Sequence, residues 1–169
     1  MASKTLVTVE EYLNTCFEGP EPDYVDGEII ERHLGSIPHF EAQQRMLEFF
    51  NSLKQSFRLF GYPEVTLRLS PNRYRIVDVA VFLGGRPSGK KYPASPPLFV
   101  VEIVSEDDRH VEILEKLADY HAWGVKYVWL VDPWMRKLSV YDESGLHEVP
   151  AFEAPEYNAK ISVAEFFAD

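Results

Sequence analysis

Two carboxylates lie inside apolar segments of this chain, where an ionised carboxylate is costly. Asp78 is the acid within the apolar residues 75–83, and Glu102 is the acid within residues 96–105. Moving a carboxylate out of water costs several kcal/mol or more unless a cation, a metal or hydrogen-bond donors compensate it. Each acid must therefore have a partner, and the identity of that partner is the functional question.

The two acids are expected to be neighbours in space. Residues 84–95, rich in Gly, Pro, Lys and Ser, connect their segments, and a hairpin-like connection would place the two strands side by side. If both side chains face the same way, they form a paired-acid site that a hard divalent ion relieves. We therefore expect Mg²⁺, for which Mn²⁺ can substitute, at Asp78 and Glu102; such an ion can activate water and stabilise a phosphoryl transition state.

Lys116 is the cation best placed to join this pair. It lies on the helix expected after the Glu102 strand, on the flank of the apolar face, and its long stem can carry the ammonium to the end of that strand. Simpler structural roles exist. Lys116 can pair with Glu112 one turn away, and Asp78 can form an ion pair with an arginine, the candidates being Arg73, Arg75 and Arg109.

The elements that must position these residues form a mixed pattern of helices and strands. In the first half we expect a helix capped by Thr8 and Glu11, a hairpin over 23–31, a long helix over 39–60 stopped by Gly61, and a half-buried strand over 65–70. In the second half we expect the two acid-bearing strands, a helix capped by Asp107 or Asp108 that runs to Trp123, strands over 127–131 and 137–141, a last strand at 147–149, and a short helix capped by Ser162 and Glu165. This order predicts one α/β domain over residues 1–169, with a mixed central β-sheet flanked by helices.

Composition excludes several classes of protein. The formal charge of −10 argues against a surface that attracts nucleic acid generally, although it leaves room for a local site. Cys16 is the single cysteine, which excludes an intrachain disulfide and a thiolate zinc cluster. We find no stretch of signal-peptide or membrane-span character and expect a cytoplasmic protein without a membrane partner.

An ordered set of motifs extends from about residue 20 to 142. Its members are Tyr24-Val25-Asp26-Gly27-Glu28, His39 with Gln43, Arg73-Tyr74-Arg75 leading to Asp78, Pro96-Pro97 leading to Glu102-Ile103-Val104-Ser105, Asp107-Asp108-Arg109, Asp119-Tyr120, Gly124-Val125 and Trp129-Leu130-Val131-Asp132-Pro133. With these motifs the chain resembles the Uma family of restriction endonucleases, which belongs to the PD-(D/E)XK nuclease superfamily.

The resemblance implies a restriction-endonuclease-like core, preceded by the N-terminal helix and hairpin, and magnesium-dependent cleavage of phosphodiester bonds in DNA. It implies that Asp78, Glu102 and the main-chain carbonyl of Ile103 ligate the metal, and that Lys116 orients or activates the attacking water. The superfamily normally has its lysine two residues after the second acid, where this chain has Val104. The lysine role must therefore pass to Lys116.

Supporting roles and rival functions complete the hypotheses. Glu28 is the most plausible further acid and His39 the most plausible further polar contact, while Arg86, Lys90 and Lys91 in the 84–95 loop are candidates for substrate contact. A second hypothesis is a catalytically inactive homodimer, associating through an exposed sheet edge at 137–141 and the segment around Trp134. A third is a hydrolase with the same site that acts on a smaller phosphodiester.

Overall fold

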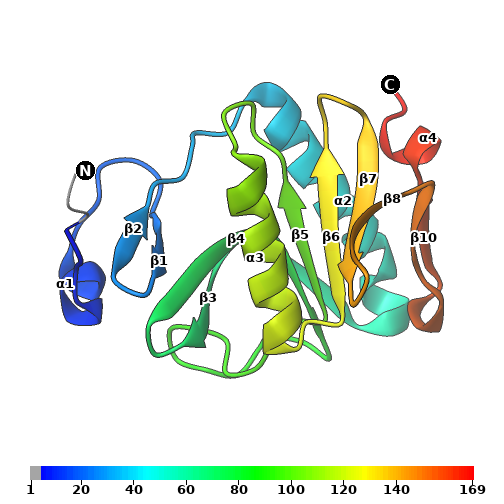
Figure 1. Ribbon diagram of the computed structural model, residues 1–169. Coiled ribbons are helices and arrows are strands. Elements are labelled where there is room, and N and C mark those ends of the chain that lie inside the picture. The colour runs from blue at the N-terminus through cyan, green and yellow to red at the C-terminus, as the bar shows by residue number, and fades with distance from the viewer. Residues whose placement is uncertain (1–4) are drawn as a thin grey trace.

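The computed structural model describes residues 5–169, and its centre is a twisted mixed sheet of eight strands (Figure 1). The hydrogen-bonded order is β2-β1-β4-β5-β6-β7-β8, with β3 paired to β4, and every pair is antiparallel except β5 with β6. The strands are β1 (Asp23–Val25), β2 (Glu28–Ile30), β3 (Leu59–Ser70), β4 (Arg73–Leu83), β5 (Phe99–Ile103), β6 (Tyr127–Asp132), β7 (Lys137–Asp142) and β8 (Gly145–Val149). The predicted mixed sheet is thereby confirmed.

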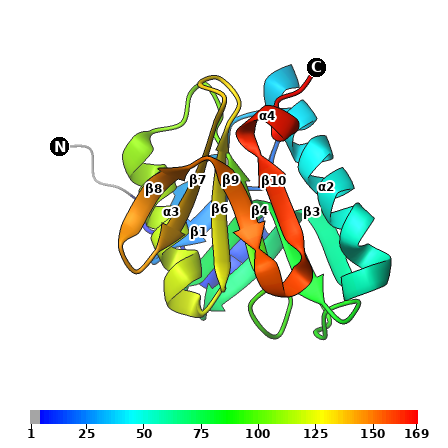
Figure 2. The ribbon, with the colours of Figure 1, turned by 90° about the vertical axis from the view of Figure 1, so that its right-hand side faces the viewer.

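Helices cover both faces of this sheet (Figure 2). The helices are α1 (Val9–Asn14), α2 (Ile37–Phe57), α3 (His110–Trp123) and α4 (Val163–Phe166). The long helix α2 packs on one face, where Met46 and Phe50 join a core with Trp129. Helix α3 packs on the other face, where Leu117 and Tyr120 enter a second core. Side chains from alternate positions of the central strands fill both layers.

The two edges of strand β4 are paired differently. Strand β3 pairs with β4 along its whole length, from Leu59 opposite Leu83 to Ser70 opposite Arg73. The other edge of β4 is shared: β1 pairs with Arg73 and Tyr74, whereas β5 pairs with residues 79–81. The stretch of β4 between these two partners is left without a strand on that edge, and its backbone groups must find other partners.

Local sequence signals explain the N-terminal elements. The capping box predicted at Thr8 and Glu11 is present at the start of α1, with both reciprocal hydrogen bonds formed. The hairpin of β1 and β2 turns at Asp26 and Gly27, which have φ values of 49° and 96°. Positive φ at both central residues is typical of the type I′ turn that Asp-Gly favours.

Two helix boundaries differ from the sequence-based prediction. Helix α2 ends at Phe57 rather than Phe60, because Arg58 adopts a left-handed conformation and the chain enters β3 at Leu59. Gly61 therefore pairs within β3 instead of stopping the helix. Helix α3 begins at His110 with Arg109 as its N-cap residue, so neither Asp107 nor Asp108 caps it.

The C-terminal third holds more structure than its sequence pattern predicted. Strand β8 is not the last strand, since β9 (Ala151–Ala154) and β10 (Ala159–Ser162) form a separate antiparallel ribbon joined by a 3₁₀ turn, Pro155–Tyr157. The expected sheet edge at 137–141 is also wrong: β7 lies between β6 and β8. Strands β9 and β10 have only four residues each, which is too short for a clear alternating pattern in the sequence. Among the described residues, no helix is both long and apolar enough to cross a membrane.

Candidate active site

The unpaired stretch of the β4 edge opens into a cavity between the N-terminal hairpin, the start of α2 and α3. The polar side chains that line it include Asp23, Arg32, His39, Asp78, Glu102 and Lys116. These residues come from β1, the β2–α2 connector, α2, β4, β5 and α3 respectively. The three predicted catalytic residues, Asp78, Glu102 and Lys116, are therefore brought together in one place.

Asp78 is buried in β4, next to the end of β5. Its Oδ2 accepts a hydrogen bond from the Ile103 N–H at 2.7 Å, and its Oδ1 lies 3.3 Å from His39 Nε2. Burial opposes ionisation of Asp78, but the hydrogen bond and charge of His39, with the Lys116 ammonium and the Ile103 N–H, hold its pKa below the ordinary value. Asp78 is thus ionised at neutral pH, and the arginine partners proposed from sequence, Arg73, Arg75 and Arg109, are not those found here.

Glu102 is the second buried acid, on the strand adjacent to Asp78. Its Oε1 accepts a hydrogen bond from the Tyr120 hydroxyl at 2.6 Å and lies 3.1 Å from Lys116 Nζ. Burial, with a smaller contribution from the charge of Asp78, raises the pKa of Glu102 to about 8, although the Lys116 ammonium opposes this shift. Glu102 therefore keeps a proton at neutral pH as long as no further cation is present.

Lys116, on α3, contacts groups on β4, β5 and β1. Its ammonium donates to the Ile76 carbonyl at 3.1 Å and to Glu102, and it lies 3.7 Å from Asp23 Oδ2. Asp23 in turn accepts the Ile76 N–H through Oδ1. The N–H and the carbonyl of Ile76, in the stretch of β4 without a strand partner on this edge, are thus satisfied by one carboxylate and one ammonium.

Sequence reasoning missed Asp23 and Tyr120, and it included His39 only as a supporting contact. His39 contacts Asp78 directly; burial disfavours its charged form, yet the hydrogen bond and charge of Asp78 raise its pKa above the ordinary value. Tyr120 lies one turn after Lys116, a spacing that places both on one helix face. That spacing, and the position of Asp23 at the start of a β-hairpin, were the available signals.

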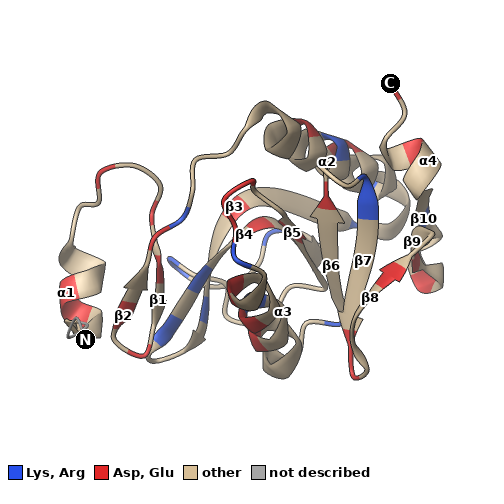
Figure 3. Cartoon of the chain, turned by 45° about the horizontal axis from the view of Figure 1, so that its top comes forward, with Lys and Arg blue, Asp and Glu red and all other residues tan. Residues whose placement is uncertain are grey.

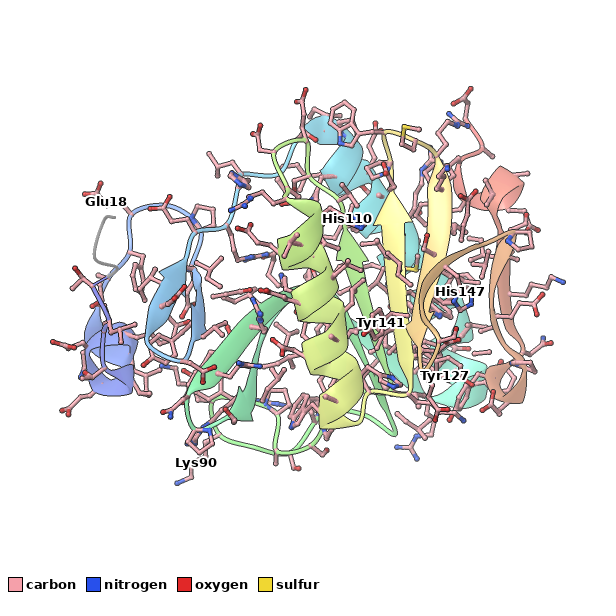
Figure 4. All side chains as sticks on the ribbon, in the orientation of Figure 1. Glu18, Lys90, His110, Tyr127, Tyr141 and His147 are labelled. Carbon is pink, nitrogen blue, oxygen red and sulfur yellow. The ribbon has the colours of Figure 1, made fainter. Side chains whose placement is uncertain are left out.

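Other predicted residues lie elsewhere. Glu28 is in β2, opposite Val25, and is not among the residues that line the cavity. Arg86, Lys90 and Lys91 line a separate hollow near Tyr62, in the loop that leaves the far end of β4. Figure 4 shows Lys90 far from His110, which begins α3 at the opposite end of the sheet. About 17 Å of strand separates Asp78 from Leu83, where this loop begins, at 3.3 Å per residue.

The donor set fits a hard divalent cation. Asp78 and Glu102 occupy adjacent antiparallel strands, one residue beyond the paired Val79 and Val101, and both supply oxygen ligands of the kind Mg²⁺ prefers. Burial and the charge of Asp78 both raise the pKa of Glu102, and a bound cation would oppose both effects by stabilising the ionised form. Within residues 5–169 no three His, Cys, Asp or Glu side chains group as a metal cluster, so the acid pair would need main-chain or water ligands.

Two comparisons with known proteins find similarity, one in sequence and one in fold. A family model described as "Uma2: Putative restriction endonuclease" matches residues 9–167. The fold is similar to a crystal structure described as a putative nuclease belonging to DUF820 from Anabaena variabilis, with a TM-score of 0.81 and 19% sequence identity over 96% of this chain and 98% of that chain. No curated protein matches the chain.

Proposed function

The chain belongs to the family described as Uma2, putative restriction endonuclease, and from that premise we propose that it is a magnesium-dependent endonuclease that hydrolyses phosphodiester bonds of DNA. One observation supports this proposal above the others. Asp78, Glu102 and Lys116, on three different elements, line one cavity. Lys116 donates a hydrogen bond to Glu102, and its charge lowers the pKa of Asp78. The proposal includes a cytoplasmic location, which the exposed Cys16 suits because thiols stay reduced there.

In this proposal the two acids hold the cation and Lys116 serves the water. Asp78 and Glu102 supply carboxylate oxygens, with the main-chain carbonyl of Ile103 beside them, and Tyr120 fixes Glu102 through its hydroxyl. When bound, Mg²⁺ or Mn²⁺ supplies an activated water and stabilises negative charge on the phosphoryl group. Lys116, held by the Ile76 carbonyl, orients that water and keeps a positive charge beside it.

The charge distribution limits how a substrate can be held. The formal charge of the chain is −10. Figure 3 shows acidic residues on α1, α3 and the loop before α3, while basic residues are spread over separate strands and connectors. General attraction of a polyanion is therefore weak, and binding must depend on a few local contacts and on the bound cation. We keep Arg86, Lys90 and Lys91 as proposed contacts for a part of the substrate distant from the cleaved bond.

The test is cleavage of plasmid and of short DNA and RNA by the parent protein and by Asp78→Asn, Glu102→Gln and Lys116→Met. We expect cleavage with Mg²⁺ or Mn²⁺ in the parent and at least a hundredfold loss in each variant, because general acid–base and electrostatic groups each contribute about 10²–10⁴-fold. Calorimetric titration of Mn²⁺ should show binding that both acid variants lose. Glu115→Gln, an exposed acid on α3, is the matched control, and thermal unfolding verifies that each variant is folded. Cleavage at the parent rate by Asp78→Asn or Glu102→Gln would contradict the assignment.

A second candidate is a homodimeric relative without catalytic activity. One observation favours it: both acids already have protein donors, Asp78 from Ile103 and His39, and Glu102 from Tyr120 and Lys116. A site satisfied by its own cations can be purely structural. Sedimentation at several concentrations with and without Mg²⁺ separates the two functions, since a dimer that neither binds metal nor cleaves DNA supports this candidate.

A further inference from the structure

Arg32 is a cation at the cavity that the proposed chemistry does not use. It lies on the connector between β2 and α2, outside any regular element, and lines the cavity. Its Nη2 is 2.8 Å from Glu64 Oε2 and 3.5 Å from Asp78 Oδ1. A single guanidinium thus touches one of the proposed metal-binding acids and a second carboxylate on the neighbouring strand.

Arg32 is the least restrained of the three Arg and Lys side chains that line this cavity. Arg75 is only 3% exposed and is bound by Asp23 and Asp119. Lys116 contacts a main-chain carbonyl and two acids. The side chains of Arg32 and Lys116 are equally exposed, at 15%, but the closer partner of Arg32, Glu64, is 46% exposed, and the contact of Arg32 with Asp78 is long. Moving Arg32 therefore disturbs fewer buried contacts than moving either of the others.

Glu64, the closer partner of Arg32, has a strained backbone conformation. It has a φ of 51° inside β3, where Pro63 and Val65 on either side pair regularly with Val79 and Val77 of β4. A left-handed conformation at a non-glycine residue costs about 1–3 kcal/mol and persists only where the surrounding structure holds it. Gln43 fixes Glu64 Oε1 at 3.0 Å and also donates to the main-chain carbonyl of Asp78. Glu64 is thus a fixed resting partner for Arg32.

We propose that Arg32 is a substrate-binding residue, whose guanidinium leaves Glu64 and Asp78 to bind a phosphate of the nucleic acid. This inference rests on the proposed nuclease function. A cation at Asp78 would neutralise the carboxylate that attracts Arg32, and a phosphate offers the planar guanidinium two charge-assisted hydrogen bonds. In the free protein Arg32 compensates the acids, and in the complex it supplies one of the few local contacts that an acidic protein needs.

The first test measures DNA affinity in Arg32→Gln and Arg32→Lys. The probe is a short fluorescein-labelled DNA duplex in Ca²⁺, chosen to limit turnover, and anisotropy reports binding. We expect about tenfold weaker binding for Arg32→Gln, the loss of one hydrogen-bonded charge, and partial retention for Arg32→Lys. Arg68→Gln is the matched control, because Arg68 is exposed and outside the cavity. It should change affinity by no more than about twofold.

The second test measures metal affinity without DNA. If Arg32 rests on Asp78, removing its charge should tighten Mn²⁺ binding by about threefold or more, as expected for a nearby partly screened charge. Arg68→Gln should leave Mn²⁺ affinity unchanged. Calorimetry on the free protein gives this result independently of cleavage. A decrease in Mn²⁺ affinity for Arg32→Gln would contradict the placement of Arg32 against Asp78 in the free protein.

The third test is a double-mutant cycle with Glu64→Gln. This variant keeps an acceptor for Gln43 and removes the charge that retains Arg32, so duplex binding should tighten. In the Arg32→Gln/Glu64→Gln double variant that gain should disappear, because Glu64 acts through Arg32. Glu112→Gln removes an equal charge from the same cavity, and its effect should be the same in both backgrounds.

The outcomes separate this inference from the proposed function. Equal duplex affinity in the parent and Arg32→Gln overturns the inference, even if the parent cleaves DNA. The predicted binding differences without cleavage under any metal overturn the nuclease function and leave Arg32 as a phosphate-binding residue. A parent protein that binds no duplex overturns both.

Discussion

Asp78 and Glu102 are similar side chains with opposite pKa shifts. Asp78 is stabilised as an anion by His39 and by the Ile103 N–H, whereas burial and the nearby charge of Asp78 keep Glu102 protonated. A pair of this kind carries about one negative charge at neutral pH without metal. Binding of a divalent cation should therefore release a proton, because the ionised form of Glu102 is the better ligand.

The raised pKa of Glu102 predicts a specific pH dependence of stability. Between its ordinary value of 4.5 and about 8, the folded protein holds a proton that the unfolded chain has lost. The free energy of unfolding should therefore fall as pH rises through this range, and Glu102→Gln, which does not titrate, should be spared this loss. The stability of Glu102→Gln relative to the parent should rise with pH and level off above about 8.

Urea unfolding in metal-free buffer below, within and above that range measures this difference. Glu115→Gln on the exposed face of α3 is the control, and its stability relative to the parent should stay constant. A difference for Glu102→Gln that does not vary with pH would show that folding leaves the pKa of Glu102 unshifted.

At the scale of elements, one face of α3 carries three polar side chains that contact the sheet. Lys116, Asp119 and Tyr120 have i, i+3 and i+4 spacing, so all three side chains can reach the sheet together. Asp119 binds Arg75 through 2.9 and 2.7 Å hydrogen bonds and Arg73 through one of 2.6 Å. Helix α3 is thereby attached to β4 beside the gap in which the site lies.

Asp119→Ala should destabilise the protein by about 3–5 kcal/mol, because the buried guanidinium of Arg75 would lose its main carboxylate partner. Denaturant unfolding measures the change. Glu115→Ala removes an acid from the exposed face of the same helix and should shift stability by less than about 0.5 kcal/mol. Equal effects of the two substitutions would mean that the Asp119 network adds no stability.

At the scale of the whole molecule, the C-terminal ribbon completes the core under α2. Phe152 of β9 stacks on Trp129 of β6, with ring centroids 4.3 Å apart and planes 3° from parallel. Phe166 of α4 is buried in the same core. Segments far apart in sequence, α2 (residues 37–57) and the ribbon (residues 151–162), thus cover one face of the sheet together (Figure 2).

Phe152→Ala should therefore cost about 3–5 kcal/mol, as for a large aromatic side chain deleted from a packed core. Phe152→Leu should cost less, since it refills part of the volume. Unfolding followed by tryptophan fluorescence detects the change, because Trp129 lies against the ring. Met135→Ala at an exposed position is the control. A loss below about 1 kcal/mol for Phe152→Ala would mean that the ribbon contributes little to the core.

The sequence by itself determined the type of fold and the central acids. Strong periodicity and turn chemistry predicted the Asp26-Gly27 hairpin, the capping boxes at Thr8 and Ser162, and the two apolar strands, all of which are present. An acid within an apolar strand is visible without a structure because its desolvation demands a partner. The adjacency of the Asp78 and Glu102 strands followed from their short connection and is confirmed.

Only the tertiary structure decided which partners those acids meet. Asp23 and Arg32 reach the site from elements far from Asp78 and Glu102 in sequence, and no local pattern reports such contacts. The position of the 84–95 loop, at the opposite end of the sheet from the cavity, likewise depends on which ends of β4 and β5 it joins. Local propensity encodes elements, whereas long-range pairing and the register of β4 place the side chains of the candidate site.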